Sequence, residues 1–318
     1  MGRSIADVFK RASVLSRSLR LGGRQPPAIE VVRALYKRLH DGQLRGDDLI
    51  ELSAVRVDNL ASCIERMHGD IRELRRMVPH YRAIYDIFRA FGPEEVVLDV
   101  GAHWGYSAVA MRRVGCRSRI ISIEPMTTNA PSLDILKTLE AGGYDWINVA
   151  ASSDEGTLTL YIPIVNGRAD TGLTSAGGGL NDGGAINAVN ATRRYPGWWG
   201  RDRFQLASVK VRASRIDTVL SEHKIGKVAA VKMDIEGHEG PALRGAVRLF
   251  AEHRPLLMVE GANRHPETLS AMNDYGYFHC ERCDGHLVPH PAMSLAADGF
   301  FVHPSRVDEY RGLGIFKD

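Results

Sequence analysis

The sequence predicts an α/β fold with a doubly wound, mostly parallel sheet, and three observations support this prediction. From Glu95 onward, short runs of β-branched and aliphatic residues alternate with helical stretches, which is typical of βαβ units. The first run contains an acid, and two glycines four residues apart follow, a pattern that predicts a ligand at a strand-to-helix turn. A chain of 318 residues, 44% hydrophobic and 25% charged, is long enough for one large domain with an appended region.

The expected strands are runs of Val, Ile and Leu that end at polar residues or glycine. In chain order they are VVLDV (96–100), RIISIE (119–124), WINVAA (146–151), VAAVKMDI (228–235), PLLMVEG (255–261) and GFFVH (299–303). Helices are expected between them, at 106–114, 131–141, 241–251 and 266–275. Strands and helices that alternate in this way form a parallel sheet with helices on its faces.

Residues 1–89 are expected to form a helical N-terminal region that precedes a domain at 90–318. Apolar residues recur every seven positions between Ile50 and Val78, with further apolar residues at intermediate positions. This a/d stripe predicts a helix that packs against another helix, either within this region or across a homodimer. The region would then serve dimerisation or the positioning of an acceptor.

The first 40 residues form a basic arm with nine Lys and Arg against two acidic residues, although the whole chain has a net charge of only +3. We expect either a solvated helix face or a peripheral contact with a membrane surface. Aromatic residues are sparse among these charges, so no nucleic acid partner is expected. Four scattered cysteines and the lack of a signal peptide or spanning run predict a cytoplasmic location.

A glycine-rich insert at about 165–206 interrupts the alternation of strands and helices. Long loops within compact domains are often lids or binding loops. The insert contains Tyr195, Trp198 and Trp199, whose rings could stack on a sugar or an apolar acceptor. The alternative is a solvated loop that one Trp anchors.

The stretch VLDVGAHWGYSAVAM (97–111) predicts a cofactor site. Asp99 ends a strand, Gly101 and Gly105 bracket the turn, and the following helix offers free N–H groups at its first turn. The spacing is not the G-x-G-x-x-G of dinucleotide sites, and Asp99 would repel a pyrophosphate but suit an ammonium group. Glu124 ends the next strand and could accept both hydroxyls of a ribose. An amino-acid end and an adenosine end together indicate S-adenosylmethionine; a nicotinamide-dependent oxidoreductase is the alternative.

A second group of polar residues follows the strand VAAVKM. Asp234, Glu236 and His238 come in close succession, and Asp234 and Glu236 would share a strand face if the strand continued. Glu260 ends the neighbouring strand and could meet Asp234 at the sheet edge. A carboxylate or His could act as general base, or Asp234 and Glu260 could ligate Mg²⁺.

Two further charged residues in this stretch have simpler interpretations. Glu239 is expected to serve the first turn of a helix, where negative charge is favourable. Lys232 is expected to be structural, because it lies on the strand itself.

From Glu95 to Pro304 the chain resembles the FkbM-type methyltransferases. The resemblance rests on VLDVGAHWGYSA, IISIEP, NVAASSDEG and RIDTVL, and above all on VKMDIEGHE followed by RPLLMVEG. It implies a class I, Rossmann-like fold and an S-adenosylmethionine-dependent O-methyltransferase that acts on a hydroxyl of a carbohydrate or natural product. The alternative outside enzymes is a protein that keeps the cofactor fold without turnover.

The resemblance also implies which residues contact the cofactor. The methionine half would contact Asp99, Gly101, Gly105 and Ser107, with Tyr106 beside them, and the ribose would contact Glu124 and its neighbour Pro125. The adenine would lie against the backbone near Ala150 and Ser152. His103 stands where the family commonly has Asn, and a polar contact to the amino-acid end is expected there.

The segment HCERCDGHLVPH offers a rival site, because Cys280, Cys283, His286 and His290 have a spacing that zinc could use. The same segment can be interpreted as a hairpin, since Asp284-Gly285 between apolar residues is a typical turn.

Overall fold

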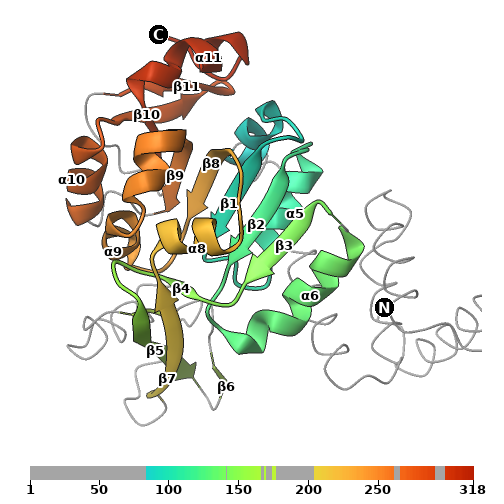
Figure 1. Ribbon diagram of the computed structural model, residues 1–318, viewed down its shortest axis with the longest axis vertical. Coiled ribbons are helices and arrows are strands. Elements are labelled where there is room, and N and C mark those ends of the chain that lie inside the picture. The colour runs from blue at the N-terminus through green and yellow to red at the C-terminus, as the bar shows by residue number, and fades with distance from the viewer. Residues whose placement is uncertain are drawn as a thin grey trace, which may run out of the picture.

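The computed structural model describes residues 84–140, 142–165, 168–169, 174–176, 204–260, 266–290 and 298–318. Within these ranges the chain forms an eight-stranded sheet with helices on both faces and a second sheet of four strands (Figure 1). The heptad stripe at 50–78, the basic arm and the aromatic residues of the insert lie outside the described residues.

The large sheet has the doubly wound arrangement that the sequence predicts. Five strands run parallel in the order β3-β2-β1-β8-β9, namely β1 (Val96–Val100), β2 (Arg119–Ile123), β3 (Tyr144–Ile147), β8 (Val228–Met233) and β9 (Leu256–Glu260). β12 (Asp298–Val302) pairs antiparallel with β9, and the hairpin of β10 (Phe278–Cys283) and β11 (His286–Pro289) completes the sheet. The sheet therefore has a mostly parallel, Rossmann-like class I topology, and the strand order reverses between β1 and β8, where such sheets hold ligands.

Alternate residues of the central strands face two separate apolar cores, which is why these runs are apolar throughout. On one face, Val97 and Ala230 pack with α5 (Tyr106–Arg113) and α6 (Ala130–Leu139). On the other face, Leu98 and Val231 pack with α8 (Ile216–Glu222), α9 (Glu239–Arg244) and α10 (Pro266–Asp274). Among the described residues, no helix is long and apolar enough to span a membrane.

Two predicted elements are divided in the structure. The run WINVAA is split, because β3 ends at Ile147 while β4 (Ala150–Ala151) joins the second sheet. The helix expected at 241–251 ends at Arg244, and a π-helix at Leu249–His253 follows it. The physical reason is Gly245, where a Cβ atom would lie 2.0 Å from the carbonyl oxygen of Ser152. The chain turns there to fit against the end of the sheet.

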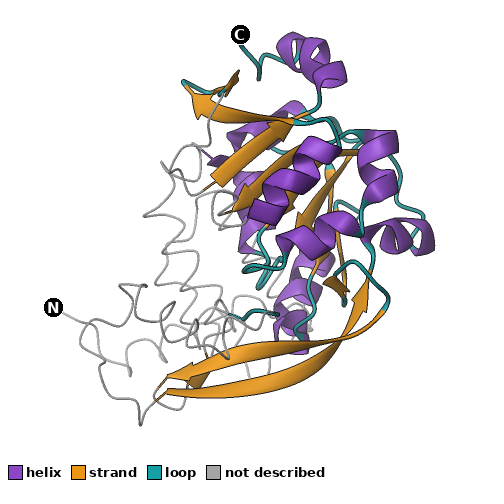
Figure 2. Ribbon diagram, turned by 90° about the vertical axis from the view of Figure 1, so that its left-hand side faces the viewer, coloured by secondary structure: helices purple, strands orange, loops and turns teal. Residues whose placement is uncertain are grey.

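The second sheet is dominated by a two-stranded ribbon that sequence analysis did not predict. β5 (Gly156–Val165) and β7 (Phe204–Ser214) pair antiparallel along their length, with β6 (Arg168–Ala169) beside β5. The ribbon follows the carboxyl end of β3, and Figure 2 shows it projecting beyond the large sheet. The predicted insert therefore joins the far ends of these two strands.

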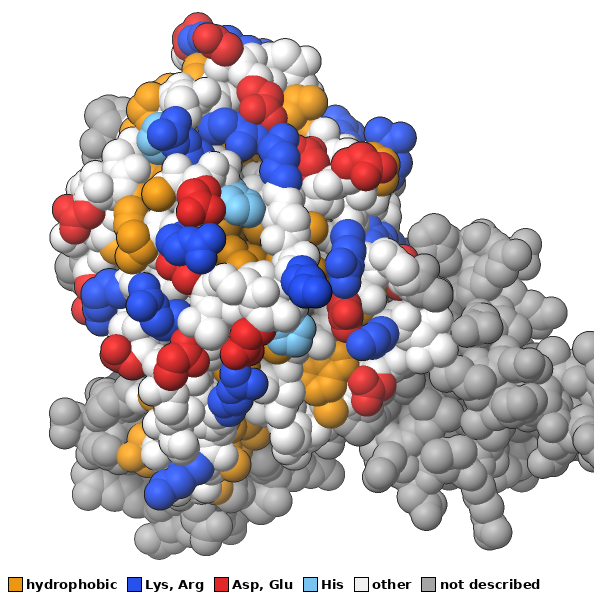
Figure 3. All heavy atoms as spheres, viewed as in Figure 1, with side chains coloured by type: hydrophobic (Ala, Val, Ile, Leu, Met, Phe, Trp, Pro, Cys, Tyr) orange, Lys and Arg blue, Asp and Glu red, His pale blue; other side chains and the backbone are white. Residues whose placement is uncertain are grey.

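The folded domain begins before residue 90. The short helix η1 (Asp86–Ala90) buries Ile87 and Phe88, and the flanking Tyr85 and Phe91 are buried in the same core. At the other end of the described chain, α11 (Val307–Gly312) contributes Tyr310 to that core. On the face in Figure 3, side chains of Lys and Arg are interspersed with those of Asp and Glu.

Candidate active site

The turn from β1 into α5 is shaped by two glycines that no other residue can replace without strain. Gly101 has φ +83°, and a Cβ atom there would lie 1.8 Å from the backbone oxygen of Asp234. Gly105 has φ +85°, and a Cβ atom there would lie 2.2 Å from Leu136 of α6. The turn, which we call the cofactor loop (residues 101–105), therefore contacts the residue that follows β8 directly.

Asp99 is fully buried and lies just before the cofactor loop. Its Oδ2 accepts hydrogen bonds from the hydroxyls of Ser107 on α5, at 2.6 Å, and Ser122 on β2, at 3.1 Å. The same carboxylate therefore links three elements. A direct contact of Asp99 or Ser107 with a cofactor stays a prediction.

Glu124 joins the cofactor loop to the end of β2. It accepts hydrogen bonds from the backbone N–H groups of His103 and Met126, both at 2.8 Å, and from the side chain of Asn129 at 3.2 Å. Burial raises the pKa of Glu124 to about 7, although these three hydrogen bonds act in the opposite direction. The Oδ1 atom of Asn129 is buried and finds no hydrogen-bond partner among the described residues. The site therefore offers a bound group a carboxylate and a free acceptor.

His103 lies in the left-handed region at φ 51°, and its ring stacks on Trp104 with centroids 4.5 Å apart. This conformation is unfavourable for residues other than glycine, and it gathers at functional sites. Tyr106, the first residue of α5, is half-buried beside them.

The residues expected at the adenine end lie just beyond the carboxyl end of β3, with Ala150 in β4 and Ser152 directly after it. The side chain of Asn148 donates to the carbonyl oxygens of Glu124 and Pro125, both at 3.0 Å. Ala150 and Ser152 are buried, and the N–H of Ser152 donates to Ser214 at 2.9 Å. That N–H is thus already used within the protein.

Asp234 and Glu260 form an acid pair at the carboxyl ends of β8 and β9. Met233 pairs with Val259 in the register, which sets the two acids side by side, and their carboxyl groups share a hydrogen bond. Glu260 is exposed on one side at the end of β9, but partial desolvation of its carboxyl group and the neighbouring Asp234 carboxylate raise its pKa to about 9. Burial opposes ionisation of Asp234, but the Lys232 ammonium and the bond from Glu260 lower its pKa. The two shifts have opposite directions, so the pair shares one proton over the neutral range, with Glu260 as the more basic partner.

Lys232 lies beside the acid pair, a contact that the sequence analysis did not predict. Its side chain is only 2% exposed, and its Nζ lies 3.1 Å from the oxygen of Gly101, 3.4 Å from Asp234 Oδ2 and 3.5 Å from Asp99 Oδ1. Burial alone would lower the pKa of Lys232, but Asp234 and Asp99 raise it well above its usual value. The available signal was a single charge in the apolar run VAAVKM, because a charge in a central strand has to be paired.

The prediction that Asp234 and Glu236 share a strand face is wrong. β8 ends at Met233, and the chain turns so that Glu236 lies exposed at φ 52°. His238 is half-buried, and its Nε2 lies 3.1 Å from the hydroxyl of Ser152. Burial, followed by the charge of Arg244, lowers the pKa of His238.

Glu239 has the local role that the sequence predicts. It is the first residue of α9, is buried, and accepts a hydrogen bond from the backbone of Ile235 at 3.0 Å. Of the other acids and the histidine predicted after β8, Asp234 pairs with Glu260 and His238 contacts Ser152.

The acid pair does not fit a magnesium site. Within the described ranges, no group of three or more His, Cys, Asp or Glu side chains could hold a metal ion. Asp234 and Glu260 share a proton, and the Lys232 ammonium lies 3.4 Å from Asp234. A divalent cation would have to displace that proton and approach that ammonium.

The zinc alternative is also wrong, and the hairpin interpretation is confirmed. Cys280 and Cys283 are separated by an odd number of positions on β10, so their side chains point to opposite faces; Cys280 is buried and Cys283 is exposed. Asp284 and Gly285 form the turn at φ 47° and 85°, as in a type I′ hairpin.

Comparison with known proteins identifies the family. The model of the methyltransferase FkbM domain matches residues 99–278, more than half of the chain, including the cofactor loop and both acids. The chain belongs to the FkbM methyltransferase family. No curated protein matches the sequence.

Several solved methyltransferase structures are similar to this member of the family. An FkbM methyltransferase from Methylobacillus flagellatus is 15% identical with a TM-score of 0.40; the match covers 87% of this chain and 58% of that one. The chain therefore spans little more than half the length of that relative. Fibrillarin from Aeropyrum pernix with bound S-adenosyl-L-methionine is 11% identical, with 67% of each chain covered and a TM-score of 0.35. An O-methyltransferase from Bacillus cereus with SAH is 10% identical, with 86% and 97% covered and a TM-score of 0.34.

Proposed function

We propose that this methyltransferase uses S-adenosylmethionine to methylate a hydroxyl group of a carbohydrate or natural-product acceptor. The observation that carries the proposal is the contact between the cofactor loop and the acid pair. A Cβ on Gly101 would meet the backbone of Asp234, so the loop packs directly against the residue that carries this carboxylate. Membership of the FkbM family supports methyl transfer.

The cofactor fits the residues at the switch point. Glu124 would accept one of the ribose hydroxyls, since a carboxylate has room for about four hydrogen bonds and Glu124 already receives three. The free Oδ1 of the neighbouring Asn129 would accept another donor of the same ligand. The close turn at Gly101 leaves backbone, not side chain, facing the methionine end.

The acid pair would handle the proton of the acceptor hydroxyl. S-adenosylmethionine, when bound, supplies a methyl group on a sulfonium, which the acceptor oxygen takes up as its own proton leaves. Asp234 is ionised at neutral pH and accepts that proton, while Glu260 stays protonated and orients Asp234 by donating to it. A lowered pKa makes Asp234 a weak base, so holding the hydroxyl in line contributes more than proton abstraction.

Two other functions receive less support. A nicotinamide-dependent oxidoreductase would need a loop that admits a pyrophosphate, and the buried Asp99 and the two-glycine spacing of G-A-H-W-G, which lacks the G-x-G-x-x-G pattern, do not suit one. A protein that binds the cofactor without turnover would not need the charged cluster at Asp234, which is expensive to bury.

The test is methyl transfer from labelled S-adenosylmethionine to a panel of hydroxylated sugars and natural products, for the wild type and Asp234→Asn. We expect Asp234→Asn to slow transfer on the order of 10²–10⁴-fold while the affinity for S-adenosylhomocysteine stays within about twofold. Asp308→Asn, which alters an acid that is 93% exposed, is the matched control and should change neither. Loss of cofactor binding in Asp234→Asn would make Asp234 part of the cofactor site, and binding without any transfer would favour the non-catalytic alternative.

A further inference from the structure

We propose that Lys232 is the positioning residue of this site: its ammonium fixes the cofactor loop against the carboxylate that faces the acceptor. The inference rests on the proposed function and deepens it. Lys232 lies between the cofactor loop and Asp234, and we infer that it holds the methionine end of the cofactor in position relative to Asp234.

The geometry matches what an ammonium can do. A Lys side chain has three N–H donors and no acceptor. Nζ of Lys232 has three oxygens around it, each from a different part of the site: the Gly101 carbonyl of the loop, Asp99 beneath the loop, and Asp234 after β8. The side chain is 2% exposed, so little water competes for these donors.

The partners of Lys232 present acceptor oxygens toward its ammonium group. Asp99 uses Oδ2 for the hydroxyls of Ser107 and Ser122, and its Oδ1 has no hydrogen bond from a described residue but lies 3.5 Å from Lys232. The carbonyl of Gly101 points to Lys232 from a backbone at φ +83°. Without the ammonium, this carbonyl would lose its hydrogen bond and the loop would lose a tie to β8.

A purely structural role would not need the charge. Replacing a buried ion pair by apolar residues of similar volume is often neutral or stabilising, so a core strand such as VAAVKM gains little from an ammonium. The ammonium lies instead among the titratable groups of the site. Those that face the cluster are Asp99 of β1, His103 of the loop, Tyr106 of α5, Tyr85 before η1, Asp234 and Glu260 of the acid pair, and Asp298 of β12.

The proposal predicts where on the ligand the effect of Lys232 is felt. Gly101 and Asp99 belong to the end of the site that would hold the amino-acid part of the cofactor, whereas Glu124 would hold the ribose. Loss of the ammonium should therefore weaken a ligand that has the amino-acid part and spare one that lacks it. General damage to the fold would weaken both.

The experiment compares S-adenosylhomocysteine with 5′-methylthioadenosine, which has no amino-acid part, by calorimetric titration of Lys232→Met. We expect S-adenosylhomocysteine to bind at least about tenfold more weakly, as for the loss of a hydrogen bond to a charged group. The affinity for 5′-methylthioadenosine should stay within about twofold. An equal loss for both ligands, or no loss for either, overturns the proposal.

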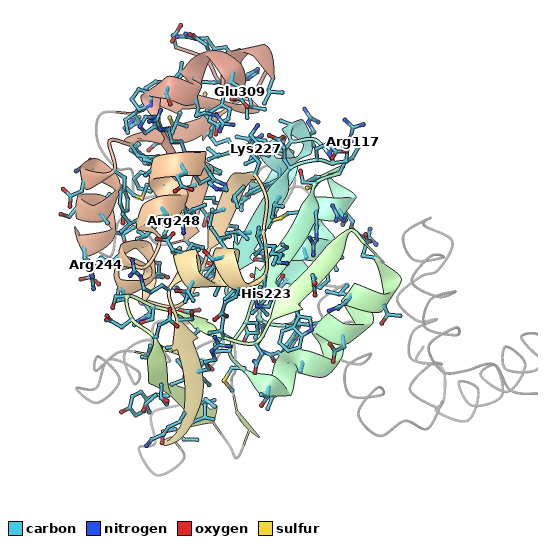
Figure 4. All side chains as sticks on the ribbon, viewed as in Figure 1. Arg117, His223, Lys227, Arg244, Arg248 and Glu309 are labelled. Atoms are coloured by element: carbon cyan, nitrogen blue, oxygen red, sulfur yellow. The ribbon has the colours of Figure 1, made fainter. Side chains whose placement is uncertain are left out.

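Lys227→Met is the matched control. Lys227 stands directly before β8, is 55% exposed and pairs with Glu95 at 2.7 Å. Figure 4 labels it at the end of the sheet that is opposite to the ribbon. The substitution removes the same ammonium group from the opposite end of the same segment, and neither ligand should bind more weakly.

A second pair of variants keeps the test decisive if Lys232→Met fails to fold. Asp234→Asn is compared with Lys232→Met/Asp234→Asn, in which the ammonium and one carboxylate leave together. The double variant should lose at least about tenfold for S-adenosylhomocysteine relative to Asp234→Asn and about twofold or less for 5′-methylthioadenosine. If the wild type binds neither ligand, the proposed function itself fails; if it binds both and the variants do not discriminate, only the role of Lys232 fails.

Discussion

A lysine and its acidic partners lie in opposite environments at the two ends of the central sheet, in a partly exposed ion pair at the amino end and in a largely buried cluster at the carboxyl end. At the amino end, Lys227 reaches Glu95 at 2.7 Å with 55% of its side chain exposed, an arrangement that contributes little and costs little. At the carboxyl end, Lys232 is 2% exposed and lies among Asp99, Asp234 and the Gly101 carbonyl. Burial of such a cluster is expensive, and the cost falls at the edge where the strand order reverses, which is where sheets of this kind hold ligands.

The glutamates at the two ends show the same contrast. Burial works to raise the pKa of Glu95, but Lys227 and the N–H of Gly92 lower it overall. Partial desolvation and the neighbouring Asp234 carboxylate raise the pKa of Glu260 to about 9, although Glu260 is exposed on one side. One end of the sheet therefore keeps its glutamate ionised in a partly exposed ion pair, and the other holds a carboxyl group whose pKa is far above its usual value, which is typical of functional sites.

The largest expected difference between the two ends is in the free energy of unfolding after Gly→Ala substitution, at one glycine from each end. Gly101→Ala would place a Cβ atom 1.8 Å from the Asp234 backbone, and we expect a loss of roughly 3 kcal/mol or more in the free energy of unfolding. Gly142 precedes β3 at the amino end, has φ +84° and has nothing within 4 Å of a Cβ position. Gly142→Ala should cost only about 1 kcal/mol for its left-handed backbone. Urea unfolding of both variants measures the difference, and similar losses would show that the carboxyl-end turn is not specially constrained.

The next effect is expected in the pH dependence of stability. Because the folded pKa of Glu260 is raised, the folded state binds more protons than the unfolded one, and wild-type stability falls as pH rises from about 4.5 to about 9. Glu260→Gln removes this term, so the stability of the variant relative to wild type should rise across that range and level off above about pH 9.

Glu95→Gln is the control, because the pKa of Glu95 is shifted in the opposite direction from that of Glu260. The pKa of Glu95 is lowered, so its contribution is fully present above its usual value of 4.5 and is lost as the pH falls through its folded pKa. Relative to wild type, Glu95→Gln should therefore show no pH trend between about pH 5 and 9. Denaturant midpoints across this range measure both variants, and a flat difference for Glu260→Gln would contradict the shared proton.

The smallest expected effect is that of metal removal. The positive charge beside Asp234 is the Lys232 ammonium, and the acid pair does not fit a divalent ion. Methyl transfer should therefore proceed at the same rate in EDTA as in magnesium. A rate that falls in EDTA and returns with Mg²⁺ would show that the carboxyl end holds a metal despite its ammonium.

The sequence predicts the large sheet well because its signals are local. Buried parallel strands are apolar on both faces, and the runs at 96–100, 119–124 and 228–235 match β1, β2 and β8 to within two residues. The ribbon of β5 and β7 was not predicted, because its strands are 38 residues apart in the chain and alternate polar with apolar residues next to a glycine-rich insert. Pairing over that distance leaves no local signal.

The site could be predicted in part for a similar reason. Asp99, Glu124, Asp234 and Glu260 each lie at the end of a strand, and the carboxyl ends of parallel strands meet at one edge. The surroundings of Lys232 could not be predicted, because they depend on the register that sets it beside Asp99. Glu236 was misjudged because the backbone turns at φ 52° directly after the strand.

The central claim, that the carboxyl end of this sheet binds S-adenosylmethionine, is tested most directly by calorimetric titration with S-adenosylhomocysteine. Wild type and Glu124→Ala are compared, with NADH as the control ligand. We expect micromolar binding to the wild type, a loss of about a hundredfold in Glu124→Ala, worth roughly 2.7 kcal/mol, and no binding of NADH. Equal affinity in the two proteins, no binding at all, or binding of NADH instead would contradict this account.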